Sequence, residues 1–114
     1  MRVLICALGL AILAGCVSPS DLKRNSPTTK AVTKKSPREY ALCVFPQWQD
    51  ARSEATMSET QNGYRLVIAA VNLTDELLEV SKAEAGSSVV FYQRVPWMPG
   101  VGRSAIEGAV KSCL

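Results

Sequence analysis

An apolar run over residues 3–13 lies almost at the start of the chain and limits how much of it can fold. Met1 and Arg2 give the run a short positive start, and the small residues Ala14 and Gly15 follow it. A charged end, an apolar middle and small residues before a cleavage point are typical of a secretory signal peptide. The run is too short to cross a bilayer as a helix, which needs about 20 residues. We therefore expect removal of this segment, which leaves enough chain for one small domain.

The last four residues of the segment, Leu13, Ala14, Gly15 and Cys16, resemble the lipobox of bacterial lipoproteins. The resemblance is confined to residues 1–16. It implies that diacylglycerol is added to the thiol of Cys16, that a peptidase cuts before this residue, and that the new amine is acylated, for example with palmitate. Several acyl chains hold a protein firmly, since each buried CH₂ contributes about 0.8 kcal/mol. The alternatives are an ordinary signal peptide with an unrelated cysteine, or a buried apolar N-terminal helix.

The residue after Cys16 is Val17. In the enterobacterial family an aspartate at this position retains the protein in the inner membrane. Val17 therefore implies an anchor in the outer membrane, with the protein facing the periplasm. In that family the membrane is contacted through the N-terminal lipid.

Residues 16–36 are predicted to form a disordered basic tether. Serine, threonine, lysine and proline dominate them, without apolar periodicity, and such a composition cannot bury a core. Residues 17–38 carry six basic side chains and one acidic side chain, Asp21, whereas residues 39–114 carry six basic and nine acidic side chains. The tether would contact anionic lipid or lipopolysaccharide phosphates, or serve as a solvated spacer. Nucleic-acid binding is disfavoured because the remaining domain is acidic.

The signal-peptide and lipobox assignments account for two of the four cysteines. Cys6 would leave with the signal peptide and Cys16 would take the lipid, so Cys43 and Cys113 remain in an oxidising compartment. We expect an intramolecular disulfide between them, which would close a long loop and stabilise the fold by about 4 kcal/mol. Two buried thiols or an intermolecular bridge are the alternatives.

The first half of residues 37–114 predicts a helix and a hairpin. Ser36, Pro37 and Glu39 form a capping-box pattern for a helix that we expect to end or kink at Pro46, with one further turn after it. Residues 54–60 and 64–70 would then pair across an Asn-Gly turn, in which Gly63 would supply a positive φ.

The second half is less uniform in pattern. Residues 74–85 suit either a helix capped by Thr74 or a strand over 77–83 that pairs with 88–95, and we favour the hairpin. A rigid loop follows over 96–100. Ser104 and Glu107 form a second capping-box pattern, and a helix from there would place four residues on one buried face: Ile106, Ala109, Val110 and Cys113.

These elements together predict an α+β fold. A small antiparallel sheet of three or four strands would carry an N-terminal and a C-terminal helix on one face, joined by the disulfide. The predicted organisation is a signal peptide over 1–15, the lipidated cysteine and tether over 16–36, and the domain over 37–114.

The residue that most often acts as the general base at neutral pH is missing from the chain. The chain contains no histidine, which excludes Ser-His-Asp systems and histidine-ligated zinc. Asp75, Glu76 and Glu79 could attract a cation, but such a group is more typical of a solvated face. We therefore predict no enzyme activity, cofactor or metal site. The alternative is a small glycan-acting enzyme that uses two carboxylates, chosen from Glu54, Glu59, Asp75, Glu76 and Glu79.

Trp97 and Met98 lie between two prolines and are the best candidates for a binding surface. Tryptophan is enriched in binding hot spots, and a rigid loop loses little entropy on binding. Arg94 and Arg103 flank the loop and are expected to join the contact. In the alternative, Trp97 folds back over the sheet. The sequence thus favours a non-enzymatic binding, assembly or inhibitor module for another envelope component, with a purely structural spacer as a further alternative.

Overall fold

The computed structural model describes residues 17–70 and 73–114 of the chain. The predictions about the signal peptide, the lipobox and Cys16 therefore lie outside the described residues. In chain order, the elements within them are α1 (Pro19–Leu22), β1 (Thr29–Thr33), α2 (Pro37–Ala51), β2 (Thr56–Thr60), β3 (Gly63–Ala70), β4 (Leu73–Ala83), β5 (Gly86–Gln93) and α3 (Arg103–Ser112).

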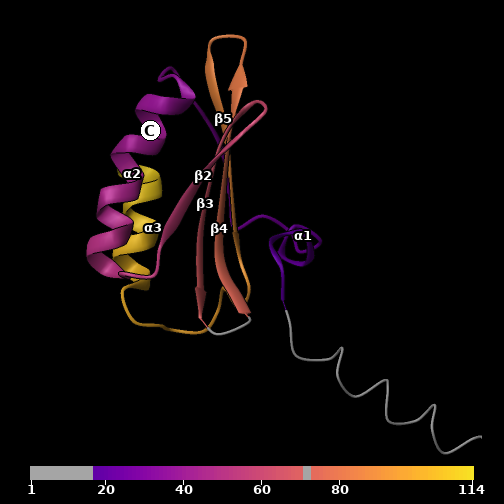
Figure 1. Cartoon of the computed structure of the whole chain (residues 1–114), viewed down its shortest axis with the longest axis vertical. Coiled ribbons are helices and arrows are strands. Elements are labelled where there is room, and N and C mark those ends of the chain that lie inside the picture. Colours follow the sequence, from indigo (N-terminus) through magenta and orange to yellow (C-terminus); the bar gives the residue numbers. More distant parts are fainter. Residues whose placement is uncertain (1–16, 71–72) are drawn as a thin grey trace, which may run out of the picture.

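The strands form one sheet in the order β1-β5-β4-β3-β2, and all neighbouring pairs are antiparallel. Helices α2 and α3 lie side by side on one face of the sheet, and α1 lies on the other face (Figure 1). This arrangement confirms the α+β class, the antiparallel sheet and the two helices on one face. The predicted number of strands is wrong, because the sheet has five.

The additional strand comes from the segment that we expected to be disordered. Residues 29–33 form β1 and pair with β5 from Thr29↔Phe91 to Thr33↔Ser87. The prediction of a disordered tether is therefore wrong for this segment. An edge strand forms hydrogen bonds on one side only and is often protected by lysine. Its sequence therefore need not show the apolar alternation on which the prediction relied.

Helix α2 begins as predicted but continues beyond Pro46. Ser36 is its N-cap and accepts a hydrogen bond from the amide of Glu39, and the helix ends only at Ala51. A proline removes the hydrogen bond to the carbonyl four residues earlier, here that of Leu42. Leu42 and Pro46 are both exposed, so water can reach that carbonyl. The predicted end of the helix at Pro46 is therefore wrong.

Two hairpins build the centre of the sheet. The first joins β2 and β3 as predicted, but Gly63 does not have a positive φ. Glycine is required there because a Cβ atom would lie 1.9 Å from the carbonyl oxygen of Val80 on β4. The second hairpin joins β4 and β5 through Glu84 and Ala85, which confirms the strand alternative for residues 74–85.

Helix α3 starts earlier than its capping-box pattern predicted. Its N-cap is Gly102, which has a φ of 71° and makes no side-chain capping bond, and Ser104 lies inside the first turn. Glu107 instead accepts a hydrogen bond at Oε1 from the side-chain Nε2 of Gln93 over 3.0 Å. The predicted buried face is confirmed, because all four of its residues are almost fully buried: Ile106, Ala109, Val110 and Cys113.

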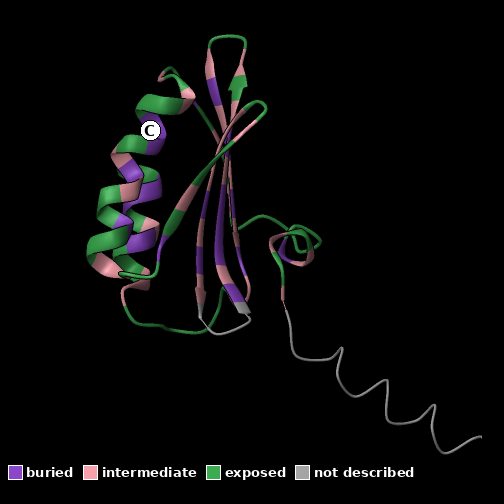
Figure 2. Cartoon of the chain, in the orientation of Figure 1, coloured by how far each residue is buried: buried purple, intermediate pink, exposed green. Residues whose placement is uncertain are grey.

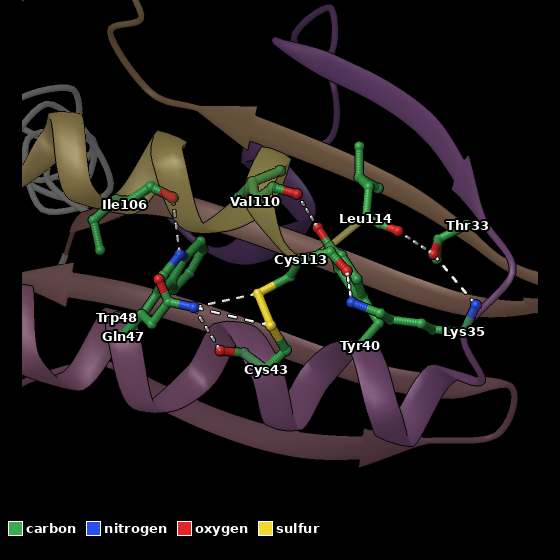
Figure 3. Close-up of a disulfide and its surroundings, with 10 residues drawn as sticks. All are labelled: Thr33, Lys35, Tyr40, Cys43, Gln47, Trp48, Ile106, Val110, Cys113 and Leu114. Atoms are coloured by element: carbon green, nitrogen blue, oxygen red, sulfur yellow. Dashed lines mark hydrogen bonds between the residues drawn. A yellow bond between two sulfur atoms is a disulfide. The ribbon is translucent and has the colours of Figure 1, made fainter.

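The core lies between the sheet and the pair α2 and α3, and the predicted disulfide closes it at one side. Cys43 and Cys113 are joined, with Cα atoms 5.9 Å apart and a sequence separation of 70 (Figure 3). The two helices are also joined by hydrogen bonds from buried side chains. The Tyr40 hydroxyl donates to the carbonyl of Val110 over 2.6 Å, and the Trp48 indole donates to that of Ile106 over 3.1 Å.

Candidate functional site

The loop between β5 and α3, residues 94–102, carries three exposed large apolar side chains. Trp97 is 80% exposed, Met98 47% and Val101 82%. Figure 2 shows this loop as an exposed segment beyond the ends of the strands. The alternative in which Trp97 folds back over the sheet is therefore wrong. We refer to residues 94–102 as the Trp97 loop, and to the side chains of Trp97, Met98 and Val101 as the Trp97 surface.

Arg103, at the start of α3, binds the backbone of the loop. Its Nη1 donates hydrogen bonds to the carbonyl oxygens of Val95 and Met98, and its Nε donates to Oε1 of Glu76 over 2.9 Å. A single guanidinium thus connects two carbonyl groups of the loop to strand β4. Its side chain is only 14% exposed, so Arg103 positions the loop and is not presented beside Trp97.

Arg94 fixes the other end of the loop. Its Nε lies 2.8 Å from Oδ1 of Asp75, and its backbone amide donates to the carbonyl of the same residue over 2.9 Å. The structure therefore brings both predicted arginines to the Trp97 loop, but each is engaged by an acid of β4. A loop held at both ends keeps its apolar side chains exposed with little freedom to withdraw them.

A β-bulge explains how two consecutive acids of one strand both reach the loop. The β3–β4 register shifts between Ile68 and Ala69, which pair with Glu76 and Thr74, so Asp75 is an extra residue in β4. A regular strand would direct neighbouring side chains to opposite faces. A bulge changes the direction of one side chain and often does so beside a functional site. No pattern in the sequence marks this bulge.

Glu76 is the most unusual acid of the group. The residue is 3% exposed, and its Oε2 has no hydrogen-bond partner, nor has Oε1 of Gln93, its cross-strand neighbour. Burial raises the pKa of Glu76, and the nearby Arg103 guanidinium opposes part of that rise. Glu76 therefore lies in an environment that penalises its charged form and depends on Arg103 for compensation.

The pocket between these groups is too small for a substrate. Arg52, Arg94, Arg103, Asp75 and Glu76 line it together with the loop, and its volume is about 100 Å³. Ligand sites usually measure about 300–1,000 Å³. Its charged side chains are also already paired: Arg94 with Asp75, Arg103 with Glu76, and Arg52 with Glu54 beside the pocket.

Of the five acids proposed for the enzyme alternative, Asp75 and Glu76 share the small pocket, and the others do not line it. Glu79 pairs with Arg65 and Lys23, each at 2.8 Å, on the sheet face that α1 covers. Glu59 lies in β2 opposite Tyr64. Asp75 and Glu76 are the two that come together, and both are paired with arginines. In the described part of the chain, no group of three or more potential metal ligands is close enough to hold an ion.

The start of the described chain lies against the same end of the sheet, which sequence reasoning missed. The carbonyl of Val17 accepts a hydrogen bond from the amide of Thr74 over 3.0 Å. Ser18 then caps α1 in a reciprocal capping box with Asp21, and backbone and hydroxyl hydrogen bonds from Ser18 hold the pKa of Asp21 below its usual value. The signal that could have revealed this helix is the Ser18/Asp21 spacing itself.

The packing of α1 shows that this segment is attached to the domain. Leu22, which ends α1, is 1% exposed, and the helix lies on β4. Lys23 extends from the helix to Glu79.

None of the helices in residues 17–70 and 73–114 is long and apolar enough to span a membrane. The chain matches no protein-family model, no curated protein and no solved structure.

Proposed function

We propose that this protein is a lipoprotein of the bacterial envelope, anchored by lipid on Cys16 in the outer membrane and facing the periplasm. In this proposal it acts as a non-enzymatic binding or assembly module that contacts another envelope component through the Trp97 surface. The observation that carries the proposal is the combination of three exposed apolar side chains with a loop that Arg94 and Arg103 hold in place.

An exposed tryptophan is costly in water and favourable in a contact. Large apolar side chains gain free energy when they leave water, by about 25 cal/mol for each Å² buried. A loop that is already ordered loses little conformational entropy on binding. These two properties are those of a binding hot spot, in which tryptophan is enriched.

The two alternative functions gain less support. A carboxylate-dependent enzyme needs an acid and a base that are free to exchange protons with a substrate. Asp75, Glu76 and Glu79 are instead engaged by basic side chains. A spacer that works through a flexible basic tether fits poorly with β1 in the sheet and with α1 packed on β4.

Site-specific photo-crosslinking in cells tests the proposal. A benzophenone amino acid replaces Trp97, and the matched control carries it at Leu42, an exposed position on α2. Irradiation should attach an envelope component at position 97 and give much less product at position 42. Equal yields at both positions would contradict the Trp97 surface as the binding site, and a wild-type protein without the mass of the acyl chains would contradict the anchor.

A further inference from the structure

The residue next to the lipidation site and the Trp97 surface lie at one end of the molecule. Thr74 of β4 binds Val17, and Asp75, the next residue, binds Arg94 of the Trp97 loop. Figure 1 shows the loop before α3 beyond the lower ends of the strands, and the start of the described chain beside these ends, on the face that carries α1. The opposite end carries the β4–β5 hairpin.

Covalent geometry extends this relationship to the anchor. Cys16 directly precedes Val17, and consecutive Cα atoms are about 3.8 Å apart. Because Val17 is tied to β4 and α1 packs behind it, no long flexible segment separates the lipidation site from the domain. A lipid on Cys16 would therefore hold this end of the sheet close to the bilayer.

We infer that the component contacted by the Trp97 surface is the bilayer itself: Trp97, Met98 and Val101 enter the headgroup region of the same leaflet that holds the lipid on Cys16. The inference rests on the anchor in the proposed function and names the partner of the same surface. Tryptophan favours this interface because its ring is apolar and its N–H is polar. The anchor also keeps the loop beside the bilayer at a high effective concentration, so a small apolar surface is sufficient for contact.

The charges around the loop point to a contact that does not depend on anionic lipid. Arg94 pairs with Asp75 and Arg103 pairs with Glu76, so the two guanidinium groups that flank the loop are already engaged by acids of β4. Contact through basic side chains would require anionic headgroups and would weaken with salt. Contact through the Trp97 surface should occur on zwitterionic lipid and persist in salt.

The test uses the protein purified with its lipid, whose presence is verified by mass, and reconstituted into phosphatidylcholine vesicles. Some of the phosphatidylcholine carries a spin label near the headgroup, which quenches tryptophan in contact with it. The chain has two tryptophans, and Trp48 is fully buried, so Trp97→Phe leaves only an internal reference. The labelled lipid should reduce the emission of Trp97 about twofold, leave Trp97→Phe unchanged, and act equally in high salt.

The remaining outcomes separate the inference from the proposed function. A double variant, Met98→Ser with Val101→Ser, changes exposed side chains only and should weaken the quenching. Equal quenching of the wild type and Trp97→Phe overturns the inference, as does a requirement for anionic lipid. The inference is also overturned if Trp97 is shielded from an aqueous quencher in native membranes but not in lipid vesicles. That result assigns the surface to a protein partner, while the proposed function stands. A purified protein without lipid contradicts both.

Discussion

The amide of Thr74 donates a hydrogen bond to the carbonyl oxygen of Val17 over 3.0 Å. This bond joins the residue that follows Cys16 to strand β4, next to Asp75, the acid that holds Arg94. A segment that looks like a flexible tether in sequence is thereby attached along the sheet. With the anchor that we propose on Cys16, the distance between the membrane and the domain would therefore be short.

Leu22 tests whether α1 is attached to the sheet. Leu22→Ala should lower the free energy of unfolding by about 2 kcal/mol, because a fully buried leucine is truncated. It should also make the bonds after Lys23 and Arg24 more sensitive to trypsin. The matched control is Val32→Ala in β1, where the side chain is exposed and the change should stay within about 0.5 kcal/mol. Rapid cleavage of the wild type at Lys30 would contradict the pairing of β1.

The disulfide should account for a large part of the stability. Replacing both Cys43 and Cys113 by serine should lower the free energy of unfolding by about 4 kcal/mol, since the bridge closes a loop of 70 residues. Urea unfolding measures the loss, and reduction of the wild type should reproduce it. Cys16→Ser serves as the control for an unrelated cysteine. An unchanged unfolding midpoint after reduction is incompatible with this account.

Arg103 should stabilise both the fold and the loop. Arg103→Ala removes the partner of a buried carboxylate and should cost about 3 kcal/mol, and it should also release the Trp97 loop to proteolysis. Arg103→Lys keeps the charge but not the planar fork of donors, so its effect should be intermediate. Arg24→Ala, in an exposed pair with Asp21, should change stability by less than about 0.5 kcal/mol. Equal effects of Arg103→Ala and Arg24→Ala would refute the role of Arg103.

Glu76 should give the stability a specific pH dependence. Because burial raises its pKa in the folded state, the folded protein retains a proton that the unfolded chain has lost, and stability falls as the pH rises from the unfolded pKa through the folded one. Glu76→Gln cannot lose that proton. Its stability relative to the wild type should therefore increase as the pH rises through this window, with Arg103 and Glu107 unchanged in both proteins. A constant difference between the two unfolding curves across the window would show that the pKa is not raised.

The local signals in the sequence predicted much of the fold. Capping at Ser36, the period of α3, the turn at Gly63 and the pair of remaining cysteines each depend on neighbours in sequence or on simple counting. We predicted either an end or a kink of the helix at Pro46, and the end is wrong. The helix continues because Leu42, whose carbonyl loses its hydrogen-bond partner, is exposed to solvent. The capping box predicted for Ser104 and Glu107 is wrong. Helix α3 begins one residue earlier, at Arg103, whose guanidinium donates a hydrogen bond to Glu76.

The features that were not predicted depend on contacts between residues that are far apart in the sequence. β1 forms because β5 offers a free edge, which the residues of β1 do not reveal. The pairing of Arg94 and Arg103 with Asp75 and Glu76 requires the β4–β5 register and the bulge after Ile68. The candidate loop could therefore be found from Trp97 and its flanking prolines, but the arginines were assigned to the contact surface when they in fact support the loop.

The anchor on Cys16 is the claim on which the rest depends, and the intact mass of the protein extracted from its native membrane measures it most directly. We predict the mass of residues 16–114 with a diacylglycerol and an amide-linked acyl chain, and with Cys43 and Cys113 oxidised. The Cys16→Ser chain should lack the lipid mass. A protein that still contains residues 1–15, or that begins at another residue with an unmodified Cys16, would contradict the account.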